Sequence, residues 1–327
     1  MLQLIAKHLL SALFCLAALP GLQAKAEWKV LSQKAPARAD QERILQFWTE
    51  KNIAAAKPLD LLTLTKKELN DLLHIERDQL ISLPHWPIMR LPSGSRSHHP
   101  SQASAESLPG QVQRADPNVP PFNASARLFF KLPNGELGTC SAQYVGSSYV
   151  IMTAAHCVID ENGTWHHDFL IPLAARSPSG KPIYMKWVCM SVLQAFLGPA
   201  KHAYDYAFIY TDFSGVHLGF TTDFRFSEFE SIGYPSNYEN GLRLMRVKGS
   251  VSVKGDGVVL MRDNPFGPGS SGGAWIGDLN EGESRGNYAI GLNSFKYDNK
   301  STVMGGPRFN IPWYLLWDFV DHQKCMQ

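Results

Sequence analysis

From Ser125 onward the sequence consists of short apolar or alternating runs that are separated by turn residues. This pattern is typical of an all-β fold. Strands that alternate with helices would need helical segments of about ten residues or more between the runs, and no such alternation is visible. We therefore predict about a dozen strands and one closing helix at 312–323. The strands are expected at 126–132, 141–145, 149–154, 169–174, 183–193, 206–210, 242–253, 258–261, 274–276, 288–295 and 302–310.

The part of the chain before this β-rich region has a different pattern. Residues 40–56 place apolar side chains on roughly one helical face and end before Pro58. A second amphipathic helix is expected to begin at a capping box formed by Thr65 and Glu68. Residues 91–121 are rich in proline, serine and glycine, which is the composition of a flexible linker. The expected division is a helical segment at 27–90, the linker at 91–121 and a globular domain at 122–327.

Residues 1–26 have the organisation of a secretory signal peptide. Lys7 precedes an almost wholly apolar run at 9–19, and Ala24-Lys25-Ala26 offers a cleavage site. The run is too short to span a membrane, and no later segment is long and apolar enough to do so. We therefore expect a secreted protein, extracellular or periplasmic, that has no membrane anchor.

The composition is that of a soluble globular protein, because 44% of the residues are hydrophobic, 18% are charged and the formal net charge is only +2. Basic residues are scattered along the chain, without the stripe or block that neutralises phosphates in nucleic-acid-binding proteins. The sequence therefore predicts no nucleic-acid partner.

Three stretches carry residue types that act in nucleophilic catalysis. Residues 267–275 read Gly-Pro-Gly-Ser-Ser-Gly-Gly-Ala-Trp, a tight turn that displays a serine between glycines. Glycines on both sides let backbone N–H groups turn toward one point, as an oxyanion-binding site requires. Residues 153–157, Thr-Ala-Ala-His-Cys, place His156 at the end of a predicted strand, and Asp205 leads into another one.

Along the chain the three residues come in the order histidine, aspartate, serine, and the three stretches resemble the trypsin/chymotrypsin-like serine endopeptidases. In α/β-hydrolases the order is serine, aspartate, histidine. The resemblance implies that His156 is the general base, that Asp205 orients it and that Ser271 is the nucleophile. It also implies an oxyanion hole made by the N–H groups of Gly269 and Ser271. The implied fold is two packed six-stranded antiparallel β-barrels with a C-terminal helix. The implied protein is a monomer that cuts proteins or peptides without a cofactor.

The resemblance covers about residues 122–323, and its details point to one branch of the family. Ser270 stands where trypsin has an aspartate that accepts a newly cut N-terminus. This departure, Gly233-Tyr234-Pro235 and the stretch 305–310 resemble the bacterial glutamyl endopeptidase-like branch. Within the family, the segment at 27–90 would be a propeptide that is removed in the linker. The alternative is an accessory segment that stays attached.

The wall of the primary substrate pocket is expected at Asn293, Ser294, Phe295 and Lys296. Family members specific for glutamate usually carry a histidine where Asn293 aligns, which argues against a glutamate preference. No acidic residue aligns with the pocket aspartate of trypsin, so cleavage after lysine or arginine is also not favoured. We interpret Lys296 as an exposed lysine at the pocket rim, with attraction of an acidic substrate side chain as the alternative.

Four cysteines remain after the predicted signal peptide, and they allow three pairings. The resemblance implies a disulfide between Cys140 and Cys157, which leaves Cys189 to pair with Cys325. Zinc is the other common use of cysteine, but no C-x-x-C motif and no histidines at ligand spacing accompany these residues. We therefore predict no metal site, and we interpret the histidine pairs at 98–99 and 166–167 as solvated loop residues.

Two other functions remain open at this point. The chain can be a catalytically silent homologue that acts as a binding protein, although all three catalytic residue types are present. It can also be a secreted esterase or lipase of the α/β-hydrolase type. That second alternative requires a base after Ser271, and His322 is the only histidine there.

Overall fold

The computed structural model describes residues 29–73, 88–92, 108–283, 285–298, 300–323 and 325. The predicted signal peptide lies outside these residues, and so do His98, His99 and much of the predicted linker. No helix in the described part of the chain is both long and apolar enough to cross a membrane.

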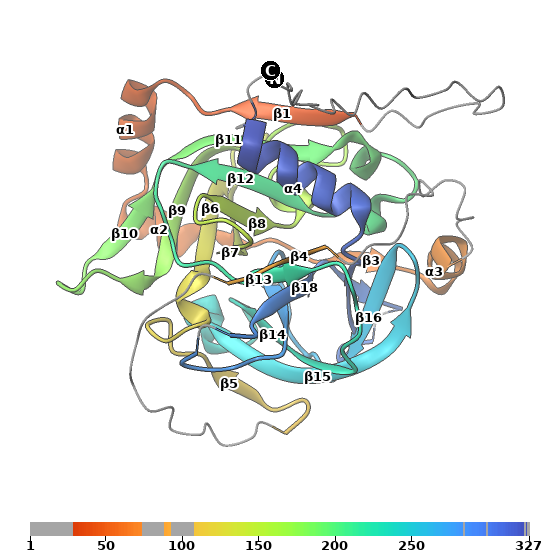
Figure 1. Ribbon diagram of the computed structural model, residues 1–327. Helices are drawn as coiled ribbons and strands as arrows, with labels where there is room; N and C mark the ends of the chain where they lie inside the picture. Colours follow the sequence, from red (N-terminus) through yellow and green to blue (C-terminus); the bar gives the residue numbers. More distant parts are fainter. Residues whose placement is uncertain are drawn as a thin grey trace, which may run out of the picture.

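Two curled, mostly antiparallel sheets form the body of the molecule and lie one above the other in Figure 1. The predicted all-β, two-barrel fold is therefore confirmed. Nine strands of the described chain form the first sheet, in the order β1-β11-β12-β8-β7-β6-β9-β10, with β2 paired to β7. Their bounds are β1 Val30–Lys34, β2 Lys57–Pro58, β6 Ser125–Lys131, β7 Leu137–Tyr144, β8 Val150–Thr153, β9 His167–Arg176, β10 Pro182–Met185, β11 Trp187–Leu193 and β12 Ala207–Thr211.

Eleven strands of the described residues form the second sheet, in the order β3-β19-β20-β16-β15-β14-β17-β18-β13-β4, with β5 paired to β15. Not all neighbours are antiparallel, because β13 runs parallel to β18 and β3 runs parallel to β19. The bounds are β3 Leu62–Leu64, β4 Met89–Arg90, β5 Val112–Arg114, β13 Gly219–Thr221, β14 Glu228–Gly233, β15 Met245–Lys254, β16 Val258–Arg262, β17 Ala274–Gly277, β18 Tyr288–Leu292, β19 Phe295–Tyr297 and β20 Met304–Pro307.

Both sheets have more than the expected six strands, and the N-terminal part of the chain contributes some of the additional strands to each of them. β1 and β2 join the first sheet, and β3, β4 and β5 join the second. β5 lies inside the stretch predicted as a linker, and its last residue, Arg114, binds Glu239 through its guanidinium at 2.7 Å. The N-terminal segment is therefore paired with both sheets in addition to forming helices.

The N-terminal helices are α1 (Arg38–Phe47), α2 (Glu50–Ala55) and α3 (Lys66–Leu73). The single helix predicted at 40–56 is broken at Trp48, whose buried indole donates a hydrogen bond to the carbonyl of Asp168 on the first sheet. Thr49 then caps α2 by accepting the N–H of Asn52. Docking of Trp48 onto the sheet thus outweighs the continuous helical pattern.

The capping box at the start of α3 has the predicted form. The N–H of Thr65 donates to Glu68 Oε2 at 2.8 Å, and the N–H of Glu68 donates to Thr65 Oγ1 at 3.2 Å. Two of the unpaired N–H groups at the helix start are satisfied in this way. The continuation of this helix beyond residue 73 lies outside the described residues.

The C-terminal helix α4 (Ile311–Gln323) packs across β8, β11 and β12 of the first sheet, as Figure 1 shows. It buries Trp313 and Trp317, and the indole of Trp317 donates a hydrogen bond of 2.9 Å to the carbonyl of Val145. A disulfide then joins Cys325 to Cys189 of β11. The end of the chain is thus fastened to the first sheet by apolar burial and by a covalent bond.

Removing this covalent bond should lower the stability of the protein. Cys189 and Cys325 are 136 residues apart in sequence, so the bond restricts a large part of the unfolded chain. The double variant Cys189→Ala, Cys325→Ala is expected to lose about 2–5 kcal/mol of unfolding free energy in guanidinium titrations. An unchanged unfolding free energy would show that burial alone fastens α4.

Candidate active site

His156 and Asp205 come together because two paired strands end beside each other. The last residue of β8, Thr153, pairs with Ala207, the first residue of β12, in an antiparallel register. His156 follows β8 in a single 3-10 turn, and Asp205 precedes β12 by two residues. Strand register therefore places both side chains at the same end of the first sheet.

The Asp205 carboxylate is fully buried and accepts three hydrogen bonds. Its Oδ1 atom accepts the backbone N–H of His156 at 2.9 Å. Its Oδ2 atom lies 2.7 Å from His156 Nδ1 and accepts the hydroxyl of Ser294 at 2.5 Å. This geometry requires a proton on Nδ1, which leaves Nε2 of the neutral ring free to accept one.

The carboxylate stays ionised although it is buried. Burial alone would raise the pKa of Asp205, but the electrostatic interaction with His156 and the hydrogen bonds from His156 and Ser294 oppose this effect. Together they hold the pKa below its ordinary value. Asp205 can therefore orient the imidazole and stabilise it when it gains a proton.

Ser271 lies in the predicted glycine turn, and the conformation of this turn explains the glycines. Gly269 and Gly272 have φ angles of +85° and +84°, a region that side chains disfavour. A Cβ atom on Gly272 would lie 2.3 Å from Thr153 Oγ1, and one on Gly269 would lie 2.7 Å from the carbonyl oxygen of Tyr234. Only glycine fits at either position.

Two buried side chains of β7 hold this turn against the first sheet. The hydroxyl of Ser141 donates to the carbonyl of Gly269 at 2.9 Å, and the N–H of Ser141 donates to the carbonyl of Ser271 at 2.8 Å. Gln143 donates to the carbonyl of Gly272 and accepts the N–H of Ala274. The serine turn belongs to the second sheet, but the first sheet fixes its position.

Two buried polar atoms at this junction have no hydrogen-bond partner among the described residues: His156 Nε2 and Ser271 Oγ. Ser271 lies beside the turn that carries His156, because its carbonyl oxygen is 3.9 Å from Cys157 Sγ. Buried polar groups without a partner are costly and uncommon. An imidazole nitrogen that can accept a proton and a hydroxyl that can give one therefore lie unpaired on neighbouring segments.

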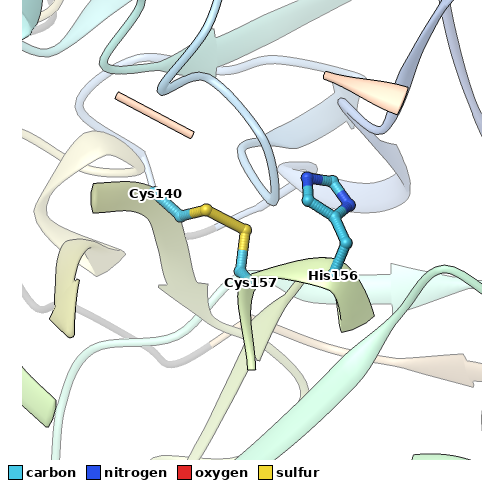
Figure 2. Close-up of side chains that lie close together, drawn as sticks. All are labelled: Cys140, His156 and Cys157. Atoms are coloured by element: carbon cyan, nitrogen blue, oxygen red, sulfur yellow. A yellow bond between two sulfur atoms is a disulfide. The ribbon is translucent and has the colours of Figure 1, made fainter. Parts of the chain in front are cut away.

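The Cys140–Cys157 disulfide links β7 to the turn of His156 and appears beside the imidazole in Figure 2. In the described part of the chain, the group closest to a metal-binding arrangement is made by these two cysteines and His156. Zinc ligation needs free thiolates, and here both sulfur atoms are bonded to each other. The arrangement thus fits a structural clamp rather than a metal centre.

Three of the four expected pocket residues have side chains that are engaged inside the protein. The buried amide of Asn293 accepts hydrogen bonds from Ser231, Asn264 and Trp275. Ser294 contacts Asp205, as described above, and the ring of Phe295 packs edge-on against His202. Sequence reasoning assigned Ser294 to the substrate pocket and missed its contact with Asp205.

Lys296 is not the exposed rim lysine that the sequence suggested. Its side chain is partly buried, and its ammonium donates to the carbonyl oxygens of Asn264 at 3.1 Å and Ser301 at 2.9 Å. Burial lowers the pKa of Lys296 to about 8. The sequence placed the lysine at the surface because its hydrogen bonds to the carbonyl oxygens of Asn264 and Ser301 are not visible in a local pattern.

His166 is also not the solvated residue that the sequence suggested, whereas His167 is exposed. The ring of His166 stacks on Phe130 at 4.9 Å, and its Nε2 donates to the carbonyl oxygen of His156 at 3.2 Å. Burial lowers the pKa of His166 to about 4, and the hydrogen bond to His156 only partly opposes this shift. His166 thus helps to hold the turn that carries His156.

Comparison with known proteins agrees with this architecture. The crystal structure of the protease Anisep from Arthrobacter nicotinovorans is 21% identical with a TM-score of 0.52, and the match covers 63% of this chain and 97% of that one. A Glu endopeptidase solved in complex with MPD is 17% identical with a TM-score of 0.51, over 64% and 95% of the two chains. The chain has a trypsin-like, glutamyl endopeptidase-like fold. No protein-family model matches it, and no curated protein matches it significantly.

The buried position of His166 predicts a pH dependence of stability. A free histidine titrates near 6.5, so below that pH the unfolded chain binds a proton that the folded chain takes up only near pH 4. Stability is therefore lost as the pH falls from about 6.5 to about 4, by about 3 kcal/mol at most. In His166→Gln, the decrease of unfolding free energy over this range should be smaller. An equal decrease in both proteins would contradict this assignment.

Proposed function

We propose that the protein is a secreted serine endopeptidase that uses His156, Asp205 and Ser271 as its catalytic residues. The observation that carries the proposal is the junction of the two sheets. There, an imidazole held by a buried carboxylate and a serine hydroxyl in a glycine turn both lack partners among the described residues. These are the groups that a serine hydrolase needs for nucleophilic attack.

The reaction follows from the roles of these atoms. Ser271 Oγ attacks the carbonyl carbon of a peptide bond while His156 Nε2 takes the hydroxyl proton, and the charge of Asp205 stabilises the resulting imidazolium. His156 then gives this proton to the leaving amine, so the peptide bond breaks and an acyl-enzyme remains. Water, activated by His156, releases the acyl group and restores the serine.

The oxyanion that forms at each attack needs hydrogen-bond donors placed in advance. We assign this role to the backbone N–H groups of Gly269 and Ser271, which belong to the glycine turn. One donor of this kind is worth about 3 kcal/mol of transition-state stabilisation. The contacts from Ser141 and Gln143 keep the turn in place and thereby support these donors.

We further propose that the protein is exported and acts as a monomer. The signal-peptide pattern at 1–26 and the two disulfides support export, because disulfides persist in oxidising compartments. We also propose that residues 27–90 are a propeptide and that residues 91–121 contain the bond cut during maturation. The domain that performs the reaction is then 122–327.

Of the two other functions that the sequence left open, the fold bears on the esterase but not on the silent homologue. The α/β-hydrolase type of esterase requires strands alternating with helices, and the described residues do not have this architecture. His322, the base which that alternative needs, lies in α4 and contacts Asp318 of the same helix at 3.0 Å. A silent homologue has the same fold as an active enzyme, so only a measurement of activity distinguishes the two.

Digestion of a mixed peptide library tests the proposal. Processed protein is incubated with the library, and the cut sites are read by mass spectrometry beside Ser271→Ala. The wild-type protein should cut, and the variant should be slower by a factor of about 10⁴ or more, because the nucleophile is missing. The absence of cuts by correctly processed wild-type protein would favour the silent homologue.

Two histidine variants test the assignment of the base. His156→Ala should lower kcat about as strongly as Ser271→Ala, since the two residues act as a unit. His322→Ala should leave kcat unchanged and serves as the control. A large loss in His322→Ala with retained activity in His156→Ala would overturn the assignment.

For the primary pocket we propose that Lys296 favours acidic substrate side chains, as the alternative interpretation of the sequence allowed. Its ammonium donates to two carbonyl oxygens, and among the described residues it forms no ion pair with a carboxylate. A substrate carboxylate would supply the missing anion. The buried amide of Asn293 then has a structural role instead of binding the substrate.

The charge of Lys296 predicts a pH profile. Cleavage after glutamate or aspartate should fall in kcat/KM as the pH rises through about 8, because the free enzyme then loses the cation. Lys296→Met should lose about tenfold or more of this cleavage, while cuts after uncharged residues persist. An unchanged preference in Lys296→Met would contradict the proposal.

A further inference from the structure

One short segment of the N-terminal region, residues 57–64, is bonded to both sheets. Its first part, β2, runs parallel to β7, with Lys57 opposite Gly138 and Pro58 opposite Thr139. Its last part, β3, runs parallel to β19, with Leu62 opposite Phe295. In Figure 1, β3 lies at the level between the upper and lower sheets. We call residues 57–64 the crossing segment.

The middle of the crossing segment reaches the serine turn. The N–H of Leu59 donates to the carbonyl of Thr139 at 3.0 Å, and its carbonyl oxygen accepts the N–H of Gly269 at 3.0 Å. Pro58 also approaches closely, because its Cβ atom lies 3.1 Å from the position of a Cβ atom on Gly269. The donor that the proposed reaction assigns to the oxyanion is therefore already used by a carbonyl of the same chain.

The C-terminal end of the crossing segment pairs with β19 along the side that β20 does not occupy, and with the residue before it. The N–H of Leu62 donates to the carbonyl of Ser294 at 3.1 Å, and the carbonyl of Leu64 accepts the N–H of Asp298 at 2.9 Å. His202 Nε2 lies 3.0 Å from the carbonyl oxygen of Thr63. Extended peptides bind proteins by adding a strand to such an edge. The crossing segment takes up this edge together with the Gly269 donor.

An apolar anchor holds the crossing segment in place. Leu64 is completely buried, and α3, which follows directly, buries Leu69 and Leu72 in the same cluster as Val258 and Phe295. The capping box at Thr65 starts α3 one residue after β3. Because this anchor is part of the same chain, the crossing segment is present at a high effective concentration and dilution does not release it.

We propose that the crossing segment is an intramolecular inhibitor of the endopeptidase site proposed above, on which this inference rests. While it is seated, the Gly269 N–H cannot stabilise an oxyanion and a substrate cannot pair with β19. The site opens when the anchor is released from the second sheet. Regulation thus acts on the Gly269 donor and the binding edge, and not on His156, Asp205 or Ser271.

The experiment compares the reactivity of Ser271 in the full chain with and without a seated segment. The probe is a small fluorescent fluorophosphonate, which reacts with an activated serine. Leu64→Asp places a charge in the apolar anchor and should release the segment. Asn70→Asp adds the same charge at an exposed position of α3 and is the matched control. Ser271→Ala gives the background.

We expect Leu64→Asp to be labelled at least about tenfold faster than the wild type, because the rate scales with the fraction of molecules in which the site is open. Asn70→Asp should be labelled like the wild type. Leu62→Pro, which lacks the N–H donated to Ser294, provides a second release variant that leaves the anchor side chains intact. Circular dichroism and melting curves verify that each variant is folded.

The outcomes separate this inference from the proposed function. Equal, fast labelling of the wild type, Leu64→Asp and Leu62→Pro, with none in Ser271→Ala, would overturn the inhibitor role and leave the endopeptidase intact. No labelling in any folded variant would overturn the endopeptidase itself. Faster labelling of either release variant, with Asn70→Asp unchanged, supports the inhibitor role.

Discussion

The buried carboxylate of Asp205 is the interaction on which the site depends. It is held by the N–H and imidazole of His156 from the first sheet and by the hydroxyl of Ser294 from the second. A buried charge is tolerated only when hydrogen bonds and an opposite charge compensate its lost hydration. Separating the sheets would therefore remove the Ser294 hydrogen bond from this carboxylate. The carboxylate that orients the imidazole thus also joins the two sheets, through its contact with Ser294.

Contacts between the sheets continue from this carboxylate to the serine turn. Ser141 and Gln143 project from β7 of the first sheet and bond to backbone groups of the turn. The glycines let the turn approach these side chains closely, and the Cys140–Cys157 disulfide joins β7 to the turn of His156. The crossing segment adds a third connection, which in our proposal is temporary. The fixed contacts build the site, and the removable one controls access to it.

The sequence predicted what local patterns encode. The predicted strand ends position His156 and Asp205, the glycine turn displays Ser271, and the capping box starts α3 as expected. The sequence did not predict strand β14, because Glu228 and Glu230 interrupt its apolar pattern. Yet Glu230 is buried, 4.0 Å from Arg246 of the paired strand. Nor did it predict β1 to β5 or the contact of Ser294 with Asp205, since their partners lie far away in sequence. A local pattern contains no information about such partners.

The central claim is that Asp205 holds a proton on His156 Nδ1 and leaves Nε2 free for Ser271. The most direct measurement is nitrogen NMR of the histidine side chains at the alkaline end of their titration, with His156 assigned by its absence in His156→Gln. We predict an Nδ1-protonated ring with an unprotonated Nε2, and a change of this tautomer in Asp205→Asn. A proton found on Nε2 in the wild-type protein would contradict the account.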